Sequence, residues 1–434
     1  MTTIYDNISK NRERINILLN GVSSTSLFKN FISLFINSFL ASILGFVFLT
    51  ITARILSAAD VGIYSTIISV VGLLGLLSRF GLDVGLVRFL PQSKDPNCLI
   101  NSCFIIGAFT SAILSMIFIS CADYFVPSLS DIFSQTIFAF CFIVIVILSV
   151  LIGFQMNIFV SRRSTKYLIL RDSTNNALKI VLVITLAVFS MQISAIDLFY
   201  IHGISLLVSI YLGYILLKKV TKNYLVIFEL DFQQIKTMMK FSSSMYVSSL
   251  IGTGSQLALP LLVLNILGAE NAAYFYITWT MRNFIELIPG SISTSLFAEG
   301  ANNPKDLYSN AKKSVAISYL FLIPVIIAIT IIGSAILSIF GEDYAQNCYH
   351  TLVLFALSVL FSSVNQIIYN IKLVNTSHRF ILLYTGCSGL GLLFFSSIFM
   401  SYLGLIGIGL SLIVSQGVIL IFILVILLVQ RQKR

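Results

Sequence analysis

The chain has 434 residues, of which 57% are hydrophobic and 10% are charged, and its mean hydropathy is +0.97. A soluble domain is about half apolar and about a quarter charged, so this composition excludes a soluble enzyme. The net charge of +10 has to be placed along the chain before it can suggest nucleic acid as a partner.

Long apolar runs predict an all-α integral membrane protein with twelve transmembrane helices. A helix needs about 20 residues to cross the hydrocarbon of a bilayer. The first run, about residues 30 to 53, is too long for the core of a signal peptide, so we expect a retained span. The predicted spans begin near residues 30, 61, 98, 136, 172, 197, 241, 272, 312, 350, 380 and 405. The short connections between them leave no room for an extramembrane domain.

Lys and Arg fall in alternate connections, which predicts the orientation of the chain. One set of connections and tails carries 23 of the 27 cations, Arg171 among them, whereas the other set carries Arg54 alone beside seven acidic residues. Because short cytoplasmic loops retain positive charge, this asymmetry places both termini in the cytoplasm. The net charge therefore indicates topology, and we expect no nucleic acid as a partner.

The longest connection divides the predicted spans into two sets of six. We expect an N-terminal lobe at residues 1–217, a cytoplasmic connection at 218–240 and a C-terminal lobe at 241–434. The second part of the connection places four apolar side chains on one helical face, which is typical of a helix lying in the membrane interface. These side chains are Phe232, Ile235, Met238 and Met239. A loop with chance periodicity is the alternative.

A weak internal repeat relates the two predicted lobes. An offset of 211 residues carries Lys29 to Lys240, and it carries the loop 55–60 to the loop 266–271. Identities within apolar runs arise easily by chance, so the loop match carries more weight. It favours a parallel duplication of six spans.

Arg282 and Glu286 are the foremost candidates for a functional site. They lie four residues apart near the middle of predicted span eight and therefore share one helical face. An ionisable group in a span is costly unless it is paired or wet, which makes it a functional candidate. We interpret Arg282 as an anion-binding residue with a titratable carboxylate beside it. An ion pair that only fixes helix packing is the alternative.

Three further charged positions are weaker candidates. Arg79 and Asp83 repeat the spacing of four in span two, and they are equally compatible with a lumenal and an interfacial position. Arg54 is the sole cation on the predicted outer side, which makes it a site candidate. In span five we expect Lys179 and Asp172 to form a structural network.

Neutral polar residues mark two other spans. In span seven, Gly252, Gly254 and Pro260 weaken the helix at mid-depth, which favours either a cavity wall or close helix packing. In span ten, Asn365, Gln366 and Asn370 are candidates for facing a sugar or for holding helices together.

Signals for catalysis or bound cofactors are poor. The six cysteines form no C-x-x-C pair, and the chain contains no P-loop motif. We therefore expect no catalytic residue, no metal and no cofactor, and any energy coupling would draw on a proton or sodium gradient.

The stretches 53–64 and 81–91 resemble the polysaccharide transporter family, the O-antigen (Wzx-type) flippases. In that family an Arg-x-Leu-Gly-type turn leads to Gly-x-Tyr, and span two ends in Gly-Leu followed by Arg-Phe. Here Arg54-Ile55-Leu56 precedes Gly62-Ile63-Tyr64, and Gly81-Leu82 precedes Arg88-Phe89. Ser57 and Ala58 replace the usual Gly-Pro, and the motif covers under a tenth of the chain.

The resemblance implies a transporter of the multidrug/oligosaccharidyl-lipid/polysaccharide exporter superfamily, with two six-helix lobes that form a V and open alternately to each side. It implies a flippase for lipopolysaccharide biosynthesis in the bacterial inner membrane. Its substrate would be an undecaprenyl-pyrophosphate-linked O-antigen repeat unit, moved from the cytoplasmic to the periplasmic leaflet. Membrane lipids and other polysaccharide assembly proteins are the partners to expect.

A pyrophosphate head needs cations in a wet cavity, so we expect Arg282, Arg79 and Arg54 to bind substrate. Glu286 and Asp83, each one turn from an arginine, are the expected ion-coupling residues. A multidrug or cation antiporter of the same fold is one alternative, and a membrane polysaccharide polymerase is the other.

Overall fold

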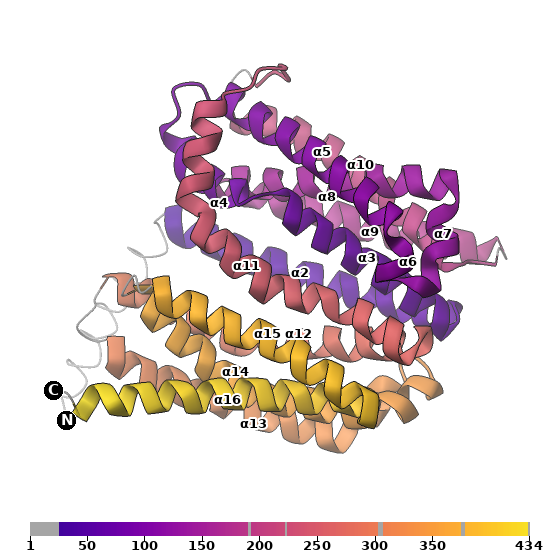
Figure 1. The fold of residues 1–434 in the computed structure, drawn as a ribbon, viewed down its shortest axis with the longest axis vertical. Helices are drawn as coiled ribbons and strands as arrows, with labels where there is room; N and C mark the ends of the chain where they lie inside the picture. The colour runs from indigo at the N-terminus through magenta and orange to yellow at the C-terminus, as the bar shows by residue number, and fades with distance from the viewer. Residues whose placement is uncertain (1–25, 190–191, 222–223, 303–306, 375–377, 433–434) are drawn as a thin grey trace, which may run out of the picture.

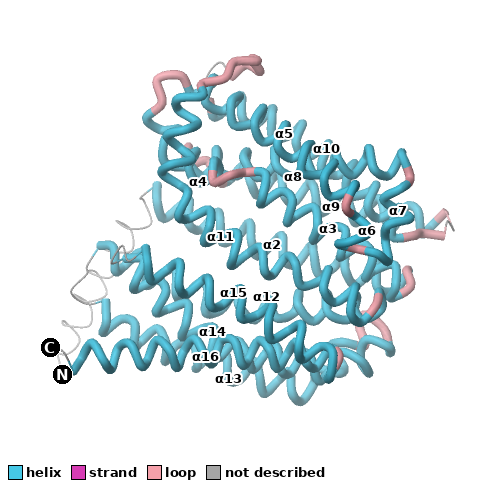
Figure 2. Tube along the Cα trace, in the orientation of Figure 1, coloured by secondary structure: helices cyan, strands magenta, loops and turns pink. Residues whose placement is uncertain are grey.

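The computed structural model describes residues 26–189, 192–221, 224–302, 307–374 and 378–432. Within these residues the chain consists of helices joined by short loops and contains no strand (Figure 2). The predicted all-α class is therefore confirmed for the described chain.

Seven long or intermediate helices form the N-terminal lobe, the upper group in Figure 1. They are α2 (Ser26–Ile55), α3 (Ala58–Ser78), α4 (Leu82–Phe89), α5 (Pro96–Ser120), α8 (Thr136–Ser161), α9 (Lys166–Val188) and α10 (Ala195–Val220). Short elements lie in two of the connections, namely η1 (Leu90–Gln92), α6 (Ala122–Phe125), η2 (Pro127–Leu129) and α7 (Ser130–Ser134).

Six helices follow and form the C-terminal lobe, the lower group in Figure 1, to which α11 crosses from the upper one. They are α11 (Phe232–Leu267), α12 (Ala269–Asn302), α13 (Leu307–Leu337), α14 (Glu342–Val374), α15 (His378–Leu403) and α16 (Leu405–Gln432). The two groups converge towards the end of the bundle that holds the turn between α2 and α3, which is the predicted outer end (Figure 1).

Ten of the described helices are long and apolar enough to cross a membrane, so the chain is a multi-pass membrane protein. The other two long helices, α9 and α12, are more polar than these ten. They carry Arg171, Asp172 and Lys179, and Arg282 and Glu286, respectively. Both have the length to span a bilayer, but the count of twelve spans stays a prediction.

Local capping residues set where several helices begin. The Ser57 hydroxyl accepts a hydrogen bond from the backbone N–H of Asp60 at the start of α3. Asp95 caps α5, whose first residue is Pro96. Ser194 and Asp197 form a reciprocal capping box at α10. Such contacts satisfy N–H groups that have no partner within the helix.

The helix boundaries follow the internal repeat. The offset that relates Ala58 to Ala269 relates the first residue of α3 to the first residue of α12. It also carries Pro96, where α5 begins, to Leu307, where α13 begins. The equivalent helices thus start at equivalent positions, which supports the predicted duplication.

The lobes meet closely where α3 packs against α12. A Cβ atom on Gly62 would lie 1.8 Å from the Ala269 carbonyl oxygen and 3.0 Å from the Ala273 nitrogen. Only glycine fits at such a distance, so the two backbones touch here. The Thr66 hydroxyl lies 3.5 Å from the Pro260 carbonyl oxygen nearby. The seam is therefore tight at the predicted outer end.

The second half of the predicted connection differs from expectation. Residues 232–240 are helical, but they are the first turns of α11, which runs unbroken to Leu267. Ile235 and Met238, assigned above to the membrane interface, are buried instead. A Cβ atom on Gly85 would lie 2.8 Å from the Met238 side chain, so Met238 packs on α4, whereas Phe232 and Met239 of the same predicted face are exposed. The predicted start of the second lobe at residue 241 falls inside this helix.

Candidate functional site

The C-terminal lobe encloses a polar cavity of about 320 Å³. Five helices of the lobe, α11, α12, α14, α15 and α16, contribute to its wall. The lining residues are Ser248, Ser249, Gly252, Thr253, Gln256, Trp279, Arg282, Glu286, Ser362, Gln366, Tyr369, Tyr384, Thr385, Ser388, Leu392, Leu412 and Gln416. Both interpretations of the stretch in predicted span seven hold for part of it: Gly252 lines the cavity, whereas Gly254 and Pro260 are buried, and a Cβ atom on Gly254 would contact Leu73 and Leu76 of α3.

Arg282 and Glu286 form an ion pair in the wall of this cavity, as their spacing predicts. Arg282 is only 4% exposed, and its Nε also lies 3.3 Å from the Ser358 hydroxyl. Glu286 accepts a second hydrogen bond of 2.8 Å from the Gln366 amide. The guanidinium lies over the Trp279 ring at 5.1 Å from its centroid. Two charges in a poorly solvated place therefore neutralise each other.

The amide residues of α14 divide between the two interpretations given above. Asn365 donates to the Gln416 side-chain oxygen at 2.8 Å, which ties α14 to α16. Asn370 donates to the Ser293 hydroxyl at 2.5 Å, which ties α14 to α12. These two residues hold helices together, whereas Gln366 lines the cavity.

A second cavity, of about 420 Å³, lies between α2 of the N-terminal lobe and α12 of the C-terminal lobe, and we call it the cleft between the lobes. It is lined by α2 on one side and by α12 on the other, and Glu286 belongs to both cavities. The lining residues from α2 are Leu34, Phe35 and Ser38. Glu286 is thus the residue at which the C-terminal cavity meets the cleft between the lobes.

An apolar groove of about 330 Å³ continues the seam between α2 and α12. Its lining residues are Ile43, Phe46, Met281, Phe284, Ile285, Ile329 and Ile336. No polar side chain lines this groove, whereas the cleft between the lobes also has Ser38, Asn283 and Glu286 in its wall.

Arg79 and Asp83 lie on either side of a break in predicted span two. The helix stops at Ser78, and Phe80 and Gly81 have positive φ of 47° and 74° before α4 begins. The Arg79 Nη1 and the Asp83 carboxylate are 3.4 Å apart, and the Arg79 Nε donates to the Gly75 carbonyl. Both side chains are about a fifth exposed, at 24% and 18%. Their predicted pairing is present, but a helix break separates them.

Arg54 lies at the other end of the bundle and joins the two lobes. Its Nε donates to the Ile339 carbonyl at 2.7 Å, and its Nη2 donates to the Ser338 carbonyl at 2.5 Å. These carbonyls directly follow α13, where the helix dipole is negative. The neighbouring rings of Phe46 and Phe340 pack edge to face at 5.2 Å. Arg54 thus lies away from the C-terminal cavity, and its substrate role stays a prediction.

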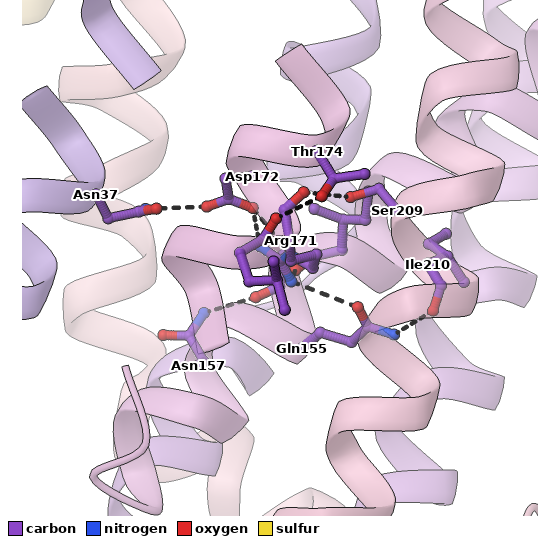
Figure 3. A network of polar contacts seen from close by, with 11 residues as sticks. Asn37, Gln155, Asn157, Arg171, Asp172, Thr174, Ser209 and Ile210 are labelled. Atoms are coloured by element: carbon purple, nitrogen blue, oxygen red, sulfur yellow. Dashed lines mark hydrogen bonds and ion pairs between the residues drawn. The ribbon is translucent and has the colours of Figure 1, made fainter. Parts of the chain in front are cut away.

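The N-terminal lobe holds a polar network that the sequence analysis assigned differently. Figure 3 shows Arg171 between Asp172 and Gln155, with Asn37 on the far side of Asp172. Arg171 Nε donates to Asp172 at 2.8 Å, and Asn37 donates to the other carboxylate oxygen at 2.9 Å. Arg171 Nη1 donates to the Ile152 carbonyl at 3.1 Å.

The structure corrects two expectations for this region. Arg171 was counted among the cytoplasmic cations, but it is 2% exposed inside the lobe. The expected network at Asp172 is present, but its direct partners are Arg171 and Asn37, and Lys179 forms no ion pair with Asp172 in the described chain; the Lys179 ammonium lies 5.9 Å from the Phe48 ring centroid. Adjacent residues on a helix point about 100° apart, so charge clustering alone could not tell which of them faces inward.

Two lobes of helices with related boundaries, and a polar cavity opening into the cleft between them, define a multi-pass membrane transporter fold. The family described as "Polysaccharide biosynthesis protein" matches residues 27–298, more than half of the chain. The chain therefore belongs to that family.

A curated relative and several solved structures are similar to the chain. The "Putative O-antigen transporter" of Shigella flexneri is 26% identical over 139 residues, which is 31% of this chain and 33% of that protein. The match thus spans about a third of that relative's length.

Among solved structures, the lipid II flippase MurJ in an inward closed conformation has a TM-score of 0.74 at 13% identity, over 91% of this chain and 87% of that one. An inward-facing multidrug resistance transporter of the MATE family has a TM-score of 0.69 at 15% identity, over 88% and 93% of the two chains. A transporter from Pyrococcus furiosus, which like the MATE protein is assigned to the MOP superfamily, has a TM-score of 0.61 at 14% identity, over 91% of this chain and 94% of that one. These likenesses show the fold.

Proposed function

We propose that the protein is a flippase that moves a lipid-linked oligosaccharide of polysaccharide biosynthesis across the bacterial inner membrane, from the cytoplasmic to the periplasmic leaflet. The observation that carries the proposal is the polar C-terminal cavity, which meets the cleft between the lobes at Glu286. A polar head group needs such a path, because each unsolvated polar group costs several kcal/mol in hydrocarbon. Membership in a polysaccharide biosynthesis family supports the same substrate class.

The apolar groove along the α2–α12 seam supports a lipid-linked substrate over a free sugar. It lies along the same two helices as the cleft, which holds the Glu286 carboxylate, and is lined by apolar side chains from α2, α12 and α13. A substrate with a polar head and a long hydrocarbon tail fits a seam that has both kinds of surface. An antiporter for small drugs or cations would need only the polar part.

The pair of Arg282 and Glu286 is the proposed coupling element. A substrate anion that draws the guanidinium away from Glu286 would leave the carboxylate without its counter-charge, and the carboxylate would then take up a proton or a sodium ion. Asp83 beside Arg79 is a second candidate of the same kind. The chain would thereby use an ion gradient without a nucleotide.

The test uses the full chain in proteoliposomes with a fluorescent undecaprenyl-pyrophosphate-linked oligosaccharide in one leaflet. We expect the rate of transfer to the other leaflet to rise with the wild-type protein and to respond to an imposed pH or sodium gradient. Transfer equal to that of protein-free vesicles, with and without a gradient, would refute the flippase. A transfer rate that changes with neither gradient would refute the ion coupling but not the flippase.

A further inference from the structure

The charged residues that line the C-terminal cavity neutralise each other within the described chain. Arg282 and Glu286 are the two charged residues in its lining, and they pair with each other. Gln366 and Ser358 satisfy further atoms of this pair. A pyrophosphate carries at least two negative charges and is bound by cations that are not already neutralised. As long as the pair is intact, the cavity offers no such cation among its described lining residues.

The hydrogen-bonding groups that remain available in the cavity are neutral. Six lining side chains have a hydroxyl or an amide NH₂ group that makes no hydrogen bond to another described residue. They are Ser249, Thr253, Gln256, Tyr369, Tyr384 and Gln416. Gln416 uses only its side-chain oxygen, which accepts from Asn365, so its NH₂ group remains.

The free hydroxyls of α11 depart from the usual behaviour of such groups in a span. A Ser or Thr hydroxyl within a helix ordinarily donates to a backbone carbonyl of the preceding turn. Ser255 and Thr278 do so here, at 2.5 and 2.8 Å. Ser249 and Thr253 do not, although they lie on the same helix face as Gln256 and line the cavity with it. They are placed to bond something inside the cavity.

The size of the cavity narrows the choice of ligand. Pockets for small ligands hold about 300–1,000 Å³, so a cavity of about 320 Å³ accepts one or two sugar rings and excludes a long lipid chain. A sugar ring presents many neutral hydroxyls, each of which can donate and accept. It also presents apolar C–H faces, which Tyr369 and Tyr384 can contact.

We propose that the C-terminal cavity is a binding site for an uncharged sugar ring of the transported head group, held by Ser249, Thr253 and Gln256. The assignment rests on the proposed function and deepens it. The ring would enter from the cleft past Glu286, and the pyrophosphate would stay outside the cavity while Arg282 pairs with that carboxylate.

Trp279 provides the measurement, because it is the single tryptophan of the chain and it lines the cavity. The experiment is a fluorescence titration of the full-length protein in nanodiscs with glucose, galactose, N-acetylglucosamine, rhamnose and inorganic pyrophosphate. We expect saturable changes with at least one of the neutral sugars. A response to pyrophosphate alone, or to none of these probes, would overturn the assignment.

Matched variants locate the site. Thr253→Val and Ser249→Ala remove hydroxyls that face the cavity, and each should weaken sugar binding about threefold to tenfold. Thr330→Val and Ser401→Ala are the controls, since those hydroxyls bond their own helices at Ile326 and Ser397. Equal affinities in all four variants and the wild type would overturn the assignment.

The flipping assay separates the two proposals. Transfer of the lipid-linked substrate without any sugar-dependent change at Trp279 would refute the sugar site and leave the flippase standing. Sugar binding at Trp279 without transfer would support the site and refute the flippase. Size-exclusion profiles and thermal unfolding of each variant confirm that the protein is folded.

Discussion

The two lobes each contain a buried arginine beside an acidic residue, and the two pairs differ in what surrounds them. In the N-terminal lobe, both oxygens of Asp172 are bonded, one by Arg171 and one by Asn37. In the C-terminal lobe, the two oxygens of Glu286 are bonded as well, one by Arg282 and one by Gln366, and the two carboxylate side chains are equally exposed, at 24% each. The pairs differ in their surroundings, because Glu286 lines two cavities of the described chain. A cavity beside the pair, and not its exposed fraction, therefore makes Glu286 the candidate site.

The largest expected effect is on stability, from Arg171→Ala. The change leaves Asp172 without its cation, and breaking a buried pair on one side costs about 3–5 kcal/mol. We expect a large drop in thermal unfolding temperature in detergent and poor expression. The double variant Arg171→Ala with Asp172→Asn should recover part of the loss. Wild-type stability of the single variant would show that the N-terminal pair is not structural.

Arg282→Ala should mainly reduce transport. Arg171 also donates to the Ile152 carbonyl and to Gln155, whereas the further hydrogen bond of Arg282 goes to Ser358, so we expect a smaller stability loss than for Arg171→Ala. Because Glu286 lines both cavities, we expect at least about a tenfold loss of transfer rate per folded molecule. Arg282→Lys should restore part of the rate, since it keeps the charge but loses the forked geometry. If Arg282→Ala instead lowers the unfolding temperature and leaves the transfer rate unchanged, the C-terminal pair is structural like the N-terminal one.

Glu286→Gln tests coupling without changing the shape of the side chain. We expect transfer in proteoliposomes to continue but to lose most of its acceleration by an imposed pH gradient, because the amide does not titrate. Gln366→Leu is the companion variant, which removes a hydrogen bond to Glu286 but no charge. If a gradient accelerates wild type and Glu286→Gln equally, Glu286 is only the structural partner of Arg282.

Arg54→Ala should open the predicted outer end without affecting either buried pair. It removes two hydrogen bonds between the lobes, which shifts the balance of conformations about threefold to tenfold. The readout is labelling of Thr66→Cys in a background without other cysteines, since Thr66 is buried in the seam. We expect faster labelling with Arg54→Ala and an intermediate rate with Arg54→Lys. Unchanged labelling would mean that these bonds do not hold the lobes together.

The smallest effect is expected from single cysteine substitutions, which test the orientation of the chain in the membrane. Single cysteines beside Asp131 and Asp343 should react with an impermeant reagent in intact cells, and those beside Arg163 and Lys313 should react only after lysis. These substitutions should leave transport unchanged. Labelling of the second group from outside would reverse the predicted topology of both lobes.

The sequence predicted the helices, the two lobes and the Arg282–Glu286 pair, because hydropathy and a spacing of four residues act along the chain. It did not predict Ser358 or Gln366 as partners of that pair, since the register between α12 and α14 depends on packing. The break at Phe80 and Gly81 was also missed, because the apolar run continues across it. Arg171 was misassigned because a cluster of cations near a span end does not reveal which of them turns inward.

The contact between α3 and α12 has one more consequence. Gly62 and Ala273 are equivalent positions in the repeat, and a residue that meets its own counterpart lies on the axis of two-fold symmetry. No side chains interlock at this contact, because neither residue has a side chain larger than a methyl group. Nothing therefore has to repack when the two helices separate. A methyl group added at Gly62→Ala would act as a wedge 1.8 Å from the Ala269 oxygen. We expect the added methyl group to keep α3 and α12 apart at the outer end and to increase the labelling rate of Thr66→Cys. A single carbon atom would then bias which side of the membrane the transporter faces.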